Sequence, residues 1–84
     1  MSRRQKLIVK LLARKKLERE VFKQLVRDDD LFELVCEEVT TRYALFLSSR
    51  DDPSESPLSD FLDWVLAHSD EIIELILKLI DLFG

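Results

Sequence analysis

The stretch that decides the fold is DEIIELILKLIDLF, residues 70–83 of an 84-residue chain. Residues three and four positions apart are neighbours on the surface of an α-helix. That spacing separates the polar residues Glu71, Glu74, Lys78 and Asp81. They therefore form one narrow stripe, and the rest of the helix is too apolar for a single neighbour to cover. We expect a helix over 70–83 that is either the central helix of the domain or part of a subunit interface.

The residues before this segment predict one more helix and a loop. The polar stretch 48–57 holds both prolines and predicts a loop, in which Ser56 and Pro57 are typical of an N-cap and a first helical residue. A helix is expected at about 58–68. Its apolar stripe comprises Leu58, Phe61, Leu62, Val65 and Leu66.

The first half of the chain predicts two helices, at about 2–27 and 30–48. Asp30 and Glu33 have the spacing of a capping box, which favours a helix start near residue 30. Because neither Gly nor Pro separates the two segments, one long bent helix is the alternative. The apolar face expected for the first helix comprises Leu7, Leu11, Val21 and Leu25, with Ile8, Leu12, Phe22 and Val26 beside them.

Composition and length predict one all-α domain, a small bundle of three to four helices. Hydrophobic residues make up 46% of the chain, with one Gly and two Pro, which excludes disorder. A chain of this size buries only about 60–65% of its unfolded surface, so the last helix is expected to exceed what one copy can cover. We therefore expect a homo-oligomer, twofold dimers being the commonest. Its expected contacts are Ile72, Ile73, Ile76, Leu77, Leu79, Ile80, Phe83 and Trp64.

A membrane span is not expected. About fifteen helical residues reach about 22 Å, which is shorter than a hydrocarbon core of about 30 Å. Anchoring at the membrane surface stays an alternative, although an acidic stripe disfavours anionic lipids.

Charge divides the chain in two. Residues 1–27 hold ten Lys or Arg and two Glu, a net +8, whereas residues 28–84 hold fifteen acids and three basic residues, a net −12. This polarity favours charge pairing within the protein or between its copies, or contact with an external anion such as nucleic acid. The residues expected to contact an anionic partner are Arg3, Arg4, Lys10, Arg14, Lys15, Lys16, Arg19, Lys23 and Arg27.

Candidate catalytic groups are few. His68 is the single histidine, and its neighbours Ser69 and Asp70 point in different directions, unlike a catalytic triad. Cys36 is expected to be a buried, inert thiol, and one Cys with one His cannot form a zinc site. The acids at 28–30 do not match a calcium loop. We therefore expect no enzymatic activity, cofactor or metal.

The function expected from these observations is that of a helical assembly or adaptor protein, self-associating through its last helix and contacting other proteins. A small nucleic-acid-binding protein that uses the basic first helix is the alternative. With one cysteine and no recognisable signal peptide, we expect a cytoplasmic or otherwise intracellular protein.

Overall fold

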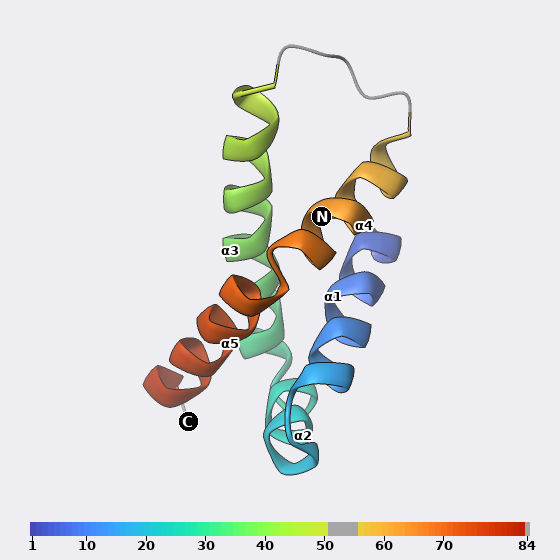
Figure 1. Cartoon of the computed structure of the whole chain (residues 1–84). Coiled ribbons are helices and arrows are strands. Elements are labelled where there is room, and N and C mark those ends of the chain that lie inside the picture. Colours follow the sequence, from blue (N-terminus) through green and yellow to red (C-terminus); the bar gives the residue numbers. More distant parts are fainter. Residues whose placement is uncertain (51–55, 84) are drawn as a thin grey trace.

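The computed structural model describes residues 1–50 and 56–83, and within these ranges the chain forms five α-helices (Figure 1). They are α1 (Arg3–Lys16), α2 (Arg19–Arg27), α3 (Asp29–Ser48), α4 (Pro57–Ala67) and α5 (Ser69–Phe83). The all-α prediction is confirmed for this part of the chain. The loop predicted over 48–57 falls largely on residues 51–55, which lie outside the described residues.

The helix predicted over 2–27 is divided, so the expected count of three to four helices is wrong. Leu17 and Glu18 have extended backbone, with ψ of 153° and 150°, and they separate α1 from α2. A straight helix would have carried polar residues such as Arg14 towards the core between two apolar ends. The break instead leaves Arg14 exposed and lets α2 bury Leu25.

One extended residue, Asp28, separates α2 from α3. Its Oδ1 accepts a hydrogen bond of 3.2 Å from the backbone N–H of Leu31, one of the amides that have no partner within the helix. The N-cap of α3 therefore lies two residues before the predicted Asp30, and the two helices that the sequence left potentially continuous are separate. Asp28 is thus both the C-cap of α2 and the N-cap of α3, and the two helices are separated without a Gly or Pro residue.

His68 alone separates α4 from α5. Its backbone N–H donates to the carbonyl of Trp64 at 3.0 Å, and its own carbonyl accepts from the N–H of Ile72 at 3.1 Å. At the other end of α4, Ser56 and Pro57 occupy the predicted N-cap and first helical position, although the Ser56 side chain makes no capping hydrogen bond.

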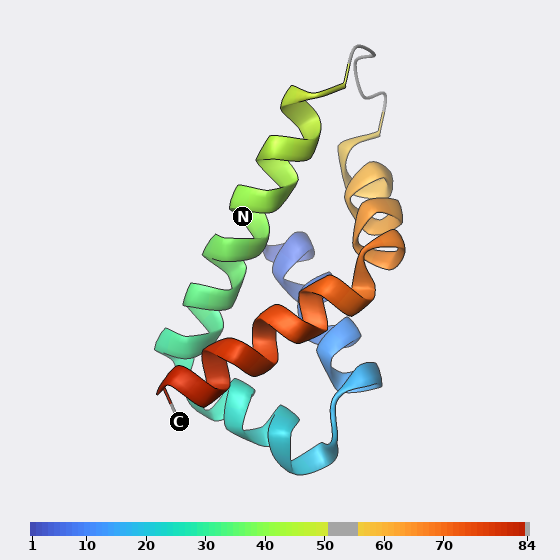
Figure 2. The same cartoon turned by 60° about the vertical axis from the view of Figure 1, so that its left-hand side comes forward.

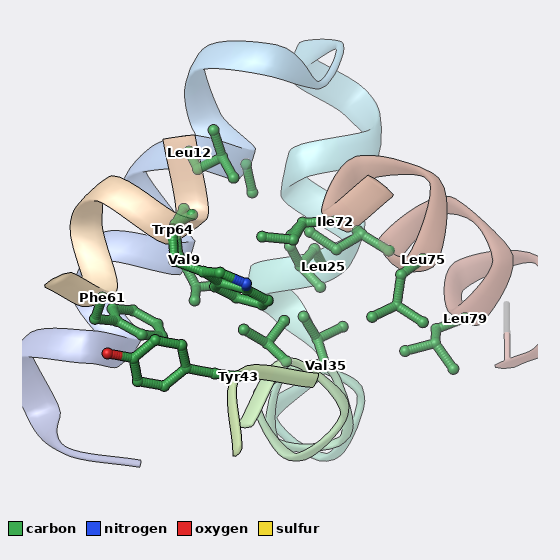
Figure 3. Close-up of a cluster of buried hydrophobic side chains, with 14 of the residues drawn as sticks. Val9, Leu12, Leu25, Val35, Tyr43, Phe61, Trp64, Ile72, Leu75 and Leu79 are labelled. Atoms are coloured by element: carbon green, nitrogen blue, oxygen red, sulfur yellow. The ribbon is translucent and has the colours of Figure 1, made fainter. Parts of the chain in front are cut away.

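Helix α5 runs obliquely across the front of the molecule in Figure 2 and packs against α3, with further contacts to α1 and α4. Every helix contributes to one hydrophobic core (Figure 3). Its members include Val9 and Leu12 of α1, Leu25 of α2, Val35 and Tyr43 of α3, Phe61 and Trp64 of α4, and Ile72, Leu75 and Leu79 of α5.

Four residues expected at a subunit interface lie instead in this core. They are Trp64, Ile72, Ile76 and Leu79, each at most 9% exposed. The three isoleucine and leucine residues are buried because α3, α1 and α4 cover the inner side of α5 within one copy. Trp64 is enclosed by aromatic rings, with the Tyr43 centroid 5.2 Å away and the Phe61 centroid 6.3 Å away. Their contacts are therefore satisfied within the chain.

Truncation of a buried α5 residue tests this core. Ile76 is fully buried, so Ile76→Ala should lower the free energy of unfolding by about 2–5 kcal/mol through lost burial and a residual cavity. Leu45→Ala is the matched control, because Leu45 of α3 is 66% exposed and its loss should change stability by less than about 0.5 kcal/mol. Urea unfolding followed by circular dichroism measures both, and equal effects would contradict the burial of α5.

Candidate interaction surfaces

The solvent side of α5 combines apolar and acidic residues. Leu77 is 44% exposed, and Ile73 and Ile80 beside it are half-buried. Three exposed carboxylates and one exposed cation flank them. We call this surface the α5 outer face, and it comprises Asp70, Ile73, Glu74, Leu77, Lys78, Ile80 and Asp81. Three of the apolar residues expected at an interface, Ile73, Leu77 and Ile80, therefore lie on this face. A fourth, Phe83, is 62% exposed at the end of the helix.

The end of α5 lies beside the junction of α2 and α3. Phe83 lines an open hollow of about 310 Å³ together with Leu31 and Leu34, and Asp28 and Asp30 lie at its edge. The exposed Phe83 ring is therefore next to the apolar start of α3 rather than isolated in solvent.

The solvent side of α1 has the opposite charge. Leu7 and Leu11 lie one helical turn apart and are 54% and 52% exposed, because the buried side of α1 is formed by Val9, Leu12 and Ala13. The sequence-based expectation that Leu7 and Leu11 face the core is therefore wrong. Exposed cations surround the two leucines. We call this surface the α1 outer face, and it comprises Arg3, Arg4, Leu7, Lys10, Leu11, Arg14 and Lys15.

An apolar groove adjoins the α1 outer face where α1 packs on α4. Leu62 and Leu66, 40% and 59% exposed, form its α4 wall. Its volume is about 170 Å³, and it is lined by Ile8, Leu11, Leu12, Lys15, Leu62, Val65 and Leu66. The sequence places Leu62 and Leu66 in the buried stripe of their helix, but α1 and the core cover only the side that carries Phe61 and Val65.

All nine residues expected to contact an anionic partner are exposed. One of them, Lys23, forms an ion pair within its own helix, with Nζ 3.7 Å from Glu20 Oε1. Among the residues that the structure describes, the other eight form no ion pair. A single bridge joins the basic first segment to the acidic remainder, from Lys6 Nζ to Glu33 Oε1 at 2.7 Å. That hydrogen bond raises the pKa of Lys6.

A hollow lined mainly by polar residues lies over the junction of α4 and α5. An open hollow of about 430 Å³ is lined by Arg42, Leu45, Trp64, His68, Glu71 and Glu74. The ring of His68 stacks on Trp64, with centroids 5.3 Å apart, and its Nδ1 lies 3.0 Å from the Trp64 carbonyl oxygen. These contacts hold the imidazole at the end of α4, where it caps the helix. The side chains that line this hollow include two carboxylates, of Glu71 and Glu74, and neither a hydroxyl nor a thiol.

Cys36 and Tyr43 are the two buried groups with altered acidity. Burial raises the pKa of the Cys36 thiol to about 11, and burial also raises the pKa of Tyr43. Cys36 is 2% exposed, so its predicted burial is confirmed, and the inertness of the thiol stays a prediction. In the described part of the chain, no group of three or more His, Cys, Asp or Glu residues is arranged to hold a metal ion.

The comparisons with known proteins add no relative. No family model matches the chain, and neither a curated protein nor a solved structure matches it. None of the helices in residues 1–50 and 56–83 is both long enough and apolar enough to cross a membrane.

The raised pKa of Cys36 makes a prediction about thiol reactivity. Its ordinary value is 9.0, so a pKa of about 11 lowers the reactive thiolate fraction at pH 8 by about 100-fold, before any steric protection. The native chain should therefore react with Ellman's reagent at least about 100-fold more slowly than the chain unfolded in urea at the same pH. Similar rates in the two states would show that Cys36 is accessible.

Proposed function

We propose that this protein is a non-enzymatic assembly or adaptor protein that self-associates. One observation carries the proposal: within the described residues of this small chain, nine large hydrophobic side chains are at least 40% exposed. Several of them gather on the α1 outer face, the α5 outer face and the groove between α1 and α4. Contiguous apolar surface that is rimmed by charge is typical of protein interaction sites.

The expected contact of α5 with a second copy is retained in a narrower form. The inner residues of α5 serve the core, so the part available to a partner is the outer face, centred on Leu77, together with Leu82 and Phe83 at the helix end. These residues suit a modest contact rather than the whole of an obligate interface, which resembles a domain core cut in half.

Sedimentation equilibrium tests self-association most simply. Full-length protein at tens of micromolar should have an average mass well above the 9.9 kDa of one chain, rising with concentration. A soluble monomer that does not aggregate over this range would contradict the proposal.

Nucleic acid binding is the second candidate, favoured by the eight exposed cations that have no ion pair in the described chain. Lys and Arg that contact phosphates release counterions, which makes binding weaken steeply as salt rises. The acidic remainder of the chain opposes this function, because its long-range potential repels a polyanion.

Fluorescence anisotropy with labelled duplex DNA and RNA across a salt series measures this binding. The triple variant Arg14→Gln, Lys15→Gln, Lys16→Gln should weaken binding at least about tenfold and flatten the salt dependence, because it removes up to three phosphate contacts. The control is Arg42→Gln with Lys78→Gln, which removes two exposed cations outside the basic segment. Absence of binding even at low salt would eliminate this candidate.

A further inference from the structure

We infer that the partner of the α1 outer face is a second copy of this chain, docked through its α5 outer face. The inference rests on the proposed self-association and specifies which two surfaces meet. It links two features of one copy: exposed leucines surrounded by cations on α1, and an exposed leucine on α5 among three carboxylates and one cation.

Charge is the first argument. The α1 outer face carries five cations, whereas the α5 outer face carries three carboxylates, Asp70, Glu74 and Asp81, and one cation, Lys78, a net charge of −2. Within one copy the opposite charges of the chain scarcely use each other, since only Lys6 and Glu33 bridge the basic segment to the acidic remainder in the described residues. We therefore expect the basic segment of one copy to pair with acidic residues of another copy. Such complementarity steers association and selects the orientation of the partners.

Shape and apolar content are the second argument. Each face has leucine at its centre, Leu7 and Leu11 on α1 and Leu77 on α5, so apolar surface meets apolar surface when the charges pair. The two charged segments also have similar lengths. Arg3 to Lys15 spans twelve helical steps, about 18 Å along the axis, and Asp70 to Asp81 spans eleven, about 16 Å. The groove beside Leu11 gives an aliphatic side chain of the partner helix an apolar place to insert.

The alternative of α1 packing on α1 is disfavoured, because it would bring five cations against five. Packing of α5 on α5 would oppose two faces that each have a net charge of −2. Like charges placed together across an interface cost binding free energy and suppress the wrong pairing. The contact of α1 with α5 is thus the arrangement in which both faces lose apolar exposure without like-charge repulsion.

A charge-swap experiment tests the inference on the full chain. One variant carries Lys10→Glu, Arg14→Glu and Lys15→Glu, and the other carries Glu74→Lys and Asp81→Lys. Each variant alone should associate at least about tenfold more weakly than the unchanged protein by sedimentation velocity, because both of its faces then carry the same charge. An equimolar mixture should recover association, since each variant now offers the complement of the other.

A matched control reverses cations outside the α1 outer face. Arg19→Glu with Arg27→Glu changes two exposed residues of α2 and should leave the association constant within about twofold. Circular dichroism checks that each variant keeps its helical content. A variant that unfolds is replaced by its neutral form, Lys10→Gln with Arg14→Gln or Glu74→Gln with Asp81→Gln, which should weaken association in the same direction.

The outcomes separate this inference from the proposed function. If the unchanged protein is monomeric, both fail. If it associates but the charge-reversed variants associate equally well, or if mixing them restores nothing, self-association stands and the contact of α1 with α5 is overturned. Weakened association of each variant together with recovery on mixing is the result that supports the inference.

Discussion

The rest of the structure depends on how α5 is covered. This helix is apolar over most of its circumference, and a chain of 84 residues has little surface with which to bury it. Helices α3, α1 and α4 enclose its inner side, where Ile72 and Ile76 are almost inaccessible to solvent. That coverage uses the inward sides of the other helices, so their remaining leucines stay outside. The exposed apolar surface of the protein is thus a consequence of filling one core with α5.

The breaks between the first three helices follow from the same constraint. A single helix over the first 27 residues would carry polar residues from its middle, such as Arg14, towards the core. Extended backbone at Leu17 and Glu18 divides this segment into α1 and α2, and Asp28 separates α2 from α3, so that each helix presents an apolar side to the core. None of these residues is Gly or Pro. Neither is required, because ordinary residue types also adopt extended φ and ψ values.

The sequence predicted the helices of the second half well, because periodic apolar residues and the Ser56–Pro57 start signal are local features. It could not predict which part of a broad apolar face points inward. Leu7 and Leu11 share the spacing of core residues, yet Val9, Leu12 and Ala13 are buried in their place. The direction of burial depends on where distant helices lie, which is information that a helical period does not contain. For the same reason Trp64 was expected outside and lies within an aromatic cluster.

The structure also shows where the charged residues lie relative to the exposed leucines. Summed over the chain, the charges nearly cancel, at −4. In space, the cations of α1 are exposed around two leucines, and three carboxylates and one cation of α5 are exposed around a third. Opposite charge and apolar surface therefore occur together on two separate faces of one copy. This arrangement suits repeated association of identical chains, since each copy carries both halves of one contact.

Isotope-filtered nuclear Overhauser spectroscopy on a mixture of labelled and unlabelled chains tests this account most directly. It detects methyl groups of different copies that lie within about 5 Å, a separation close to that of side chains in packing contact. The account predicts intermolecular signals between the methyl groups of Leu7 or Leu11 and those of Leu77. Intermolecular signals that join Leu77 to Leu77, or that avoid α1 altogether, would contradict it.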